Sequence, residues 1–125
     1  MSGDWHLDGI TEFMGFRHEA PGRISLTIGP ELMNRGGMLS GAVAFTLVDY
    51  AMGSALWPQI TEDEAIATLN ISINYVATAT EGEVVCRSQV DRRNRSQAVL
   101  RSEVHADDGR LLATAIGSFS IYPRR

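Results

Sequence analysis

One carboxylate stands alone in an apolar stretch of this chain. Between Gly36 and Thr61 the only charged residue is Asp49. A carboxylate in apolar surroundings is costly unless it is paired or hydrogen-bonded, and such groups are enriched among catalytic acids, bases and nucleophiles. Asp49 is therefore the first candidate for chemistry. The alternative is a structural carboxylate that accepts a hydrogen bond from a backbone amide.

A glycine-rich segment precedes this carboxylate. Residues 34–41 read Asn-Arg-Gly-Gly-Met-Leu-Ser-Gly and lead into the apolar run. Glycines let a ligand approach the backbone closely, and the first N–H groups of a helix can donate to an anion or a polarised carbonyl oxygen. The segment can thus form an oxyanion-binding site. The alternative is an ordinary glycine turn with Ser40 as the helix N-cap.

The spacing between these groups limits how they could act together. From Gly41 to Asp49 is eight residues, roughly 12 Å along an α-helix at about 1.5 Å per residue. One small carbonyl group cannot contact both within one chain. If both act, they come from different subunits, with Asn34 and the Gly41 N–H of one protomer facing Asp49 of the other. The active unit is then a homodimer.

A long helix is needed to position both groups. Residues 41–57 predict it, because the segment is rich in Ala, Leu, Val and Met, follows Ser40 as a plausible N-cap and ends before Pro58. Almost no side of this helix is polar, so we expect it to be buried nearly all round by a sheet. A short N-terminal helix is predicted at residues 10–16.

Segments with period-two alternation predict that sheet. Turn residues at 92–95 and 107–109 favour a meander of strands. In the strand at 65–76 one face is apolar and the other polar, and one face packs on the helix: Ala67, Leu69, Ile71, Ile73 and Tyr75 against Thr68, Asn70, Ser72 and Asn74. The other strands are predicted at 23–28, 83–90, 97–106 and 110–122. The sequence thus predicts an α+β hotdog fold, an antiparallel sheet wrapped around one long central helix, in a single domain of residues 1–125.

Composition narrows the partners and the compartment. The net charge of -4 lacks the basic footprint of a nucleic-acid binder. Cys86 is the only cysteine, so no intrachain disulfide can form and a reducing, cytoplasmic location fits; residues 1–10 lack the pattern of a signal peptide. A membrane span over the apolar run would bury Asp49 near mid-bilayer, so no membrane contact is expected. His6, His18 and His105 show no metal-ligand spacing, and neither a metal nor a cofactor is expected.

The residues quoted so far also carry a family resemblance. Residues 34–53, N-R-G-G-M-L-S-G-A-V-A-F-T-L-V-D-Y-A-M-G, resemble the signature of the phenylacetic-acid-degradation (PaaI-like) thioesterases of the hotdog superfamily. The similarity continues to the C-terminus, through a second strand at 69–77 and a closing hairpin that includes 108–113 and 117–119. The resemblance implies an acyl-coenzyme A thioesterase, which hydrolyses an acyl-CoA to a free acid and CoA.

The resemblance also implies roles for particular residues. The family's helix carboxylate, which activates water or attacks the thioester, maps to Asp49. The asparagine that holds substrate and water maps to Asn34, and the glycine amide that polarises the carbonyl maps to Gly41. A hydroxyl often found near the carboxylate maps to Thr68. The family usually has His-Gly-Gly where this chain has Ser40-Gly41-Ala42, so Ser40 can donate a hydrogen bond there but cannot supply a cation.

Several alternatives stay open. Arg93 and Arg95, with Arg92, form a basic turn that either contacts the phosphates of CoA or is simply solvated. The missing histidine leaves room for a hotdog protein that binds acyl-CoA without hydrolysing it. A hotdog dehydratase would need a positioned histidine, and none lies near the helix. The sequence predicts neither the acyl group nor whether dimers pair into a homotetramer.

Overall fold

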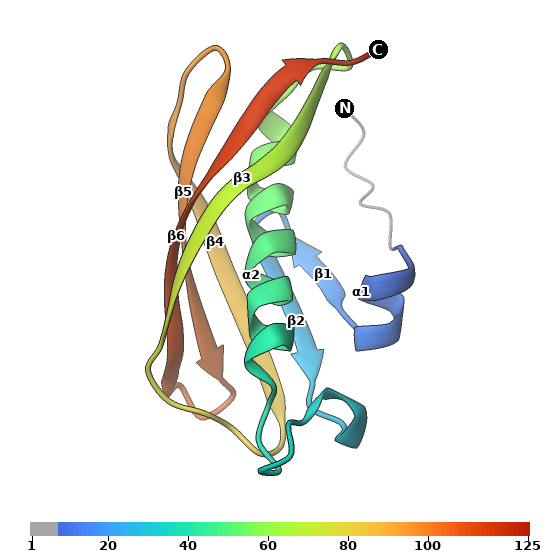
Figure 1. The fold of residues 1–125 in the computed structure, drawn as a ribbon, viewed down its shortest axis with the longest axis vertical. Coiled ribbons are helices and arrows are strands. Elements are labelled where there is room, and N and C mark those ends of the chain that lie inside the picture. Colours follow the sequence, from blue (N-terminus) through green and yellow to red (C-terminus); the bar gives the residue numbers. More distant parts are fainter. Residues whose placement is uncertain (1–7) are drawn as a thin grey trace.

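The computed structural model describes residues 8–125, so His6 and most of the N-terminal segment discussed above lie outside the described residues. A six-stranded antiparallel sheet curls around the central helix α2, which confirms the predicted hotdog fold (Figure 1). Among the described residues, no helix is long and apolar enough to cross a bilayer. In chain order the elements are α1 (Gly9–Met14), β1 (Arg17–Ala20), β2 (Arg23–Thr27), η1 (Pro30–Leu32), α2 (Gly41–Leu56), η2 (Trp57–Gln59), β3 (Glu64–Tyr75), β4 (Glu83–Arg93), β5 (Gln97–Ala106) and β6 (Leu111–Pro123).

The strand order corrects the predicted meander. Strands β4, β5 and β6 do follow one another as antiparallel neighbours, but β3 pairs with β6 and β2 pairs with β4, giving the order β1-β2-β4-β5-β6-β3. Alternation identifies which segments are strands but carries no information about which strands pair. As a result β3 is an edge strand, and one of its ladder edges has no partner within the described chain.

The predicted burial of the long helix is half right. α2 begins after the Ser40 N-cap as predicted, and one side of it is fully buried, with Leu47, Val48, Ala51 and Met52 all 0% exposed. The opposite side is open, because the sheet wraps only part of the helix. Along it run exposed or half-exposed residues at helical spacing, and we call these the open stripe of α2: Ala42, Phe45, Thr46, Asp49 and Gly53.

A β-bulge corrects the predicted faces of β3. The ladder between β3 and β6 shifts register between Thr68 and Asn70, which leaves Leu69 without a partner. Before the bulge, Thr68 lies opposite the buried Phe119 and so faces the helix; after it, Ile71, Ile73 and Tyr75 face the helix. Strict alternation would place Thr68 and Tyr75 on opposite faces. The extra residue brings both to the inner face.

One strand is longer than predicted, and another strand was not predicted. β4 continues to Arg93, through a register shift between Val90 and Arg92, where the sequence predicts a polar turn. The short strand β1, with the polar sequence Arg-His-Glu-Ala, carries no apolar alternation, so sequence reasoning missed it. Its pairing with β2 extends the sheet around the helix on the flank opposite β3.

Candidate active site

The Asp49 carboxylate is held from one side. The Thr68 hydroxyl donates a hydrogen bond to Asp49 Oδ1 at 2.6 Å, from β3 to the open stripe of α2. Oδ2 accepts no hydrogen bond from any described residue. Asp49 is half-exposed, so the expected buried carboxylate is wrong for the single chain. A carboxylate with one oxygen held and the other without a hydrogen-bond donor among the described residues can act as a base or as a nucleophile.

Next to the Thr68–Asp49 hydrogen bond, α2 packs closely against the sheet. Gly117 of β6 lies opposite Ile71, just past the bulge, and a Cβ on Gly117 would lie 2.8 Å from Met52 Sδ and 3.0 Å from the Asn70 carbonyl oxygen. A side chain at residue 117 would displace the end of Met52 and crowd the backbone of β3, so glycine lets Met52 of α2 pack against the sheet beside β3, the strand that carries Thr68.

Asn34 organises the turn that leads into α2. Its Oδ1 accepts hydrogen bonds from the Gly36 N–H at 2.9 Å and the Met38 N–H at 3.2 Å. The side-chain oxygen is therefore occupied, and the two N–H donors of the amide are the groups left for a ligand. This turn is closed by Gly37, whose φ of 77° is in the left-handed region that favours glycine.

The N-terminus of α2 leaves one donor unused. Ser40 Oγ accepts a hydrogen bond from the Ala42 N–H at 3.2 Å, and the Ser40 carbonyl accepts from Val43 and Ala44 at 3.1 Å each. The Gly41 N–H has no partner within the helix and donates to no described residue. Because Ser40 Oγ is used as an acceptor, its own proton remains free to be donated elsewhere.

A cavity of about 240 Å³ opens beside Gly41. Asn34, Gly41 and Tyr75 line it together with an apolar wall. That wall consists of Met38, Leu39, Ala44, Ala77, Ala79, Val104, Leu112 and Ala113. Asp49 and Thr68 are not part of it. Within one chain the structure therefore brings Asn34 to Gly41 and Thr68 to Asp49, but it keeps these two groups apart.

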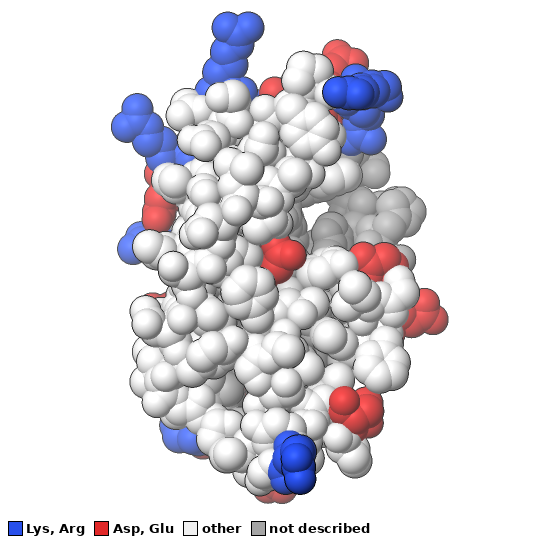
Figure 2. All heavy atoms as spheres, viewed as in Figure 1, with Lys and Arg blue, Asp and Glu red and all other residues white. Residues whose placement is uncertain are grey.

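The face that carries the open stripe is apolar. Figure 2 shows mostly uncharged side chains over α2 and β3, with an acidic group near the middle and basic groups toward the ends. Phe45 on α2 is 38% exposed, and Leu69, Tyr75 and Val76 at the edge strand are 53%, 54% and 58% exposed. Exposed apolar side chains on a face with few charges are typical of an interaction surface.

The two arginines of the predicted site lie in and beside the β4–β5 turn, at the C-terminal end of α2 (Figure 1). Arg93 is engaged within the chain: it donates to Glu64 Oε2 at 2.8 Å and to the Gln59 carbonyl oxygen. A backbone hydrogen bond from Thr61, and then Arg93, lower the pKa of Glu64. Arg95 is exposed. In the single chain both arginines are remote from the cavity beside Gly41.

Sequence reasoning missed a polar contact next to Asp49. The Tyr50 hydroxyl donates to Asp8 Oδ2 at 2.6 Å, and Asp8 is also the N-cap of α1. This hydrogen bond to Asp8, followed by burial, raises the pKa of Tyr50 to about 12. The contact fastens α1 to α2 one residue from the candidate catalytic group. The Asp8–Thr11 capping box can be recognised in the sequence, but it predicts only where α1 begins and not the contact with Tyr50.

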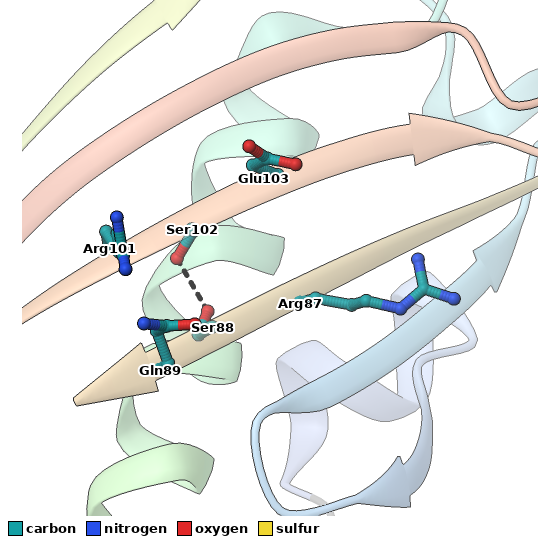
Figure 3. Close-up of a pocket in the computed structure, with 6 residues that line it drawn as sticks. All are labelled: Arg87, Ser88, Gln89, Arg101, Ser102 and Glu103. Atoms are coloured by element: carbon teal, nitrogen blue, oxygen red, sulfur yellow. Dashed lines mark hydrogen bonds between the residues drawn. The ribbon is translucent and has the colours of Figure 1, made fainter. Parts of the chain in front are cut away.

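A second hollow, of about 380 Å³, contains none of the predicted site residues. Arg87, Ser88 and Gln89 of β4 and Arg101, Ser102 and Glu103 of β5 line it. Figure 3 shows its charged side chains diverging rather than converging on one point, and Ser88 and Ser102 hydrogen-bonded to each other at 2.6 Å. Among the described residues, no group of His, Cys, Asp and Glu side chains is arranged to hold a metal ion.

The sequence of this chain matches the profile of a known protein family. The profile of the thioesterase superfamily matches residues 36–113, more than half of the chain. This chain belongs to the thioesterase superfamily. The match begins in the turn held by Asn34, includes all of α2 and ends in β6, so it spans both Gly41 and Asp49.

This superfamily member is also similar to individual proteins, in sequence or in fold. A Saccharolobus solfataricus protein named as an esterase is 26% identical over 117 residues, which cover 90% of this chain and 77% of that protein. A Bacillus halodurans protein solved with CoA has a TM-score of 0.88 at 22% identity, covering 94% of this chain and 78% of that one. A phenylacetic acid degradation-related protein of Ralstonia eutropha has a TM-score of 0.84 at 19% identity, covering 93% and 92%.

The family profile confirms the thioesterase-superfamily part of the predicted resemblance, and the structural neighbours confirm the fold. These comparisons support thioester hydrolysis as the class of reaction. Which thioester is hydrolysed, which residues catalyse the reaction and how the chains assemble are inferred below from the geometry of the site.

Proposed function

We propose that this protein is an acyl-CoA thioesterase that works as a homodimer, with each active site shared between two protomers. Asp49, held by Thr68, comes from one protomer, while Asn34 and the Gly41 N–H come from its partner. The observation that carries this proposal is the separation of the two half-sites. Each is assembled within the chain by hydrogen bonds or by a cavity, but they occupy different turns of α2.

The open stripe of α2 and the edge strand β3 supply the means of joining them. This surface is apolar, runs past Asp49 and includes the unpaired edge of β3. A two-fold axis across it makes the two copies of α2 antiparallel, so the Gly41 end of one helix approaches the middle and C-terminal end of the other. Contact between the copies would also enclose the half-exposed carboxylate.

The chemistry follows from the donors and acceptors. Asp49 takes a proton from a water molecule that attacks the thioester carbonyl carbon, or its carboxylate attacks that carbon directly. The partner's helix N-terminus, through the Gly41 N–H, stabilises the negative charge that develops on the carbonyl oxygen. The C–S bond then breaks, and the CoA thiolate leaves and takes up a proton. When water is the nucleophile the acid is released at this step; when the carboxylate attacks directly, the acyl group is left on Asp49 as an anhydride, and water hydrolyses it to release the acid and restore Asp49. Ser40 has a free hydroxyl proton within the same turn.

The cavity beside Gly41 suits the acyl group. Its wall is mostly apolar, and its volume of about 240 Å³ fits a short to medium aliphatic or an aromatic acyl group. The Bacillus halodurans neighbour was solved with CoA, which supports a CoA thioester as the substrate. Arg95, exposed at the far end of α2, can meet the CoA phosphates of a site completed by the partner, whereas Arg93 is already bound to Glu64. The unpaired Cys86 favours the cytoplasm.

The deciding experiment compares wild type with Asp49→Asn on phenylacetyl-, benzoyl-, butyryl- and hexanoyl-CoA, followed by release of free thiol. Asparagine keeps the shape and the contact with Thr68 but cannot act as a base, so we expect kcat to fall by about 10²–10⁴-fold. Asp63→Asn, an exposed carboxylate outside both half-sites, is the matched control and should retain full activity. Bound acyl-CoA without turnover by wild type would instead establish the binding-only protein suggested by Ser40.

A further inference from the structure

The first peptide group of α2 is held by side chains at both ends. The Tyr75 hydroxyl donates to the Gly41 carbonyl oxygen at 2.7 Å, and the N–H of the same peptide group, that of Ala42, donates to Ser40 Oγ at 3.2 Å. The Ser40 contact is an ordinary N-cap. The Tyr75 contact is not, because it comes from a strand and bonds a carbonyl that already faces into the helix.

The ring of Tyr75 also lies against Gly41. A Cβ on that glycine would sit 3.3 Å from Cζ and 3.4 Å from Cε1 and the hydroxyl oxygen of Tyr75. Residue 41 is therefore covered on the side that a side chain would otherwise occupy. Tyr75 lines the cavity with Asn34, so its ring and its hydroxyl are both next to the place where a carbonyl group would bind. A tyrosine hydroxyl is protonated at neutral pH and can therefore donate, and burial raises the pKa of Tyr75 further.

The bulge in β3 is what makes this contact possible. Thr68 and Tyr75 are seven residues apart, an odd number, yet both face the helix because Leu69 is an extra residue in the ladder. Each of the two hydroxyls then bonds α2: Thr68 at Asp49 and Tyr75 at Gly41. One strand thus fixes both functional groups of the helix.

We propose that Tyr75 is a positioning residue that aligns the Gly41 N–H toward the thioester carbonyl by fixing the first turn of α2. This inference rests on the proposed thioesterase function for its catalytic consequence. Helix ends fray, and glycine has the most backbone freedom of any residue. A donor contributes most to transition-state stabilisation when its direction is set in advance. The contact from β3 supplies that restraint where the N-cap alone would leave residue 41 mobile.

The test removes only the hydroxyl. In Tyr75→Phe the ring still covers Gly41 and lines the cavity, so we expect KM to change by less than about twofold while kcat falls by about tenfold. Tyr122→Phe is the matched control, since Tyr122 is exposed on β6 and its hydroxyl bonds no described residue. An unchanged kcat in Tyr75→Phe, or an equal loss in Tyr122→Phe, would overturn the catalytic role.

A second readout does not depend on hydrolysis. In full-length protein labelled with ¹⁵N-glycine, we expect the order parameter of the Gly41 N–H to fall from about 0.85 toward about 0.6 in Tyr75→Phe, with the other glycines unchanged. An unchanged Gly41 value would refute the positioning role even if wild type is active. If wild type hydrolyses no acyl-CoA, the proposed function fails, and the order parameter still decides whether Tyr75 fixes residue 41.

Discussion

The two ends of the proposed site are built in opposite ways. At the Gly41 end, the chain forms a walled cavity and fixes the helix terminus with Asn34, Ser40 and Tyr75. At the Asp49 turn, a single hydroxyl holds the carboxylate on an open apolar surface. The first region is walled within one chain, whereas the second is half-exposed there. In the proposed dimer, the second protomer would add enclosure and chemistry to a cavity that each protomer already has.

Mixing two inactive variants tests whether the two half-sites of one active site come from different protomers. Asp49→Asn and Asn34→Ala each disable one half-site, so a mixed dimer has one site with both defects and one intact site. A 1:1 mixture should recover about a quarter of wild-type activity, because about half of the dimers are mixed and each has one working site of two. Thiol release after co-refolding measures it.

The control for that mixture uses two variants of the same half-site. Asp49→Asn with Thr68→Val leaves every mixed dimer with an impaired carboxylate in both sites, so little activity should return. Absence of recovery in the first mixture, while its dimers form normally, would show that the site is built within one chain.

A charged substitution on this face tests whether a second protomer covers Asp49. Leu69→Asp places a carboxylate on a side chain that is 53% exposed at the edge strand, and it should weaken the dimer by about 100-fold in Kd. Activity at nanomolar protein should fall with it. Light scattering coupled to gel filtration gives the mass. Ile116→Asp is the control, because Ile116 is 66% exposed but lies on β6 opposite Ser72, on the outer face of the sheet. A dimeric Leu69→Asp protein would exclude this face.

The smallest expected effect is on thermal stability, through the hydrogen bond by which Tyr50, next to Asp49 on α2, holds Asp8. The pKa of Tyr50 is raised to about 12 by its hydrogen bond to Asp8, above an ordinary value near 10 in the unfolded chain. Its contribution to stability is therefore full below pH 10 and is lost as the pH rises toward 12. Melting temperatures from pH 9 to 12 should fall more steeply for wild type than for Tyr50→Phe. Parallel curves would mean that the contact adds nothing to folding.

Much of this molecule follows from local sequence. The N-cap at Ser40, the extent of α2, the positions of β5 and β6 and the isolation of Asp49 can all be predicted, because capping, helical length and alternation depend on neighbours in the chain. The spacing of Gly41 and Asp49 is equally a property of the sequence, since the rise of a helix is fixed. From these, a hotdog fold and a shared site could be predicted.

The tertiary structure decided the rest. Strand pairing moved β3 to the edge of the sheet, a choice that no alternation pattern encodes. The unpaired Leu69 turned Thr68 toward Asp49, and it left Tyr75 facing Gly41. A bulge depends on the partner strand, so its own sequence shows only regular alternation. The open stripe likewise depends on how far the sheet curls, because an apolar helix looks the same in sequence whether its own chain or a second copy covers it.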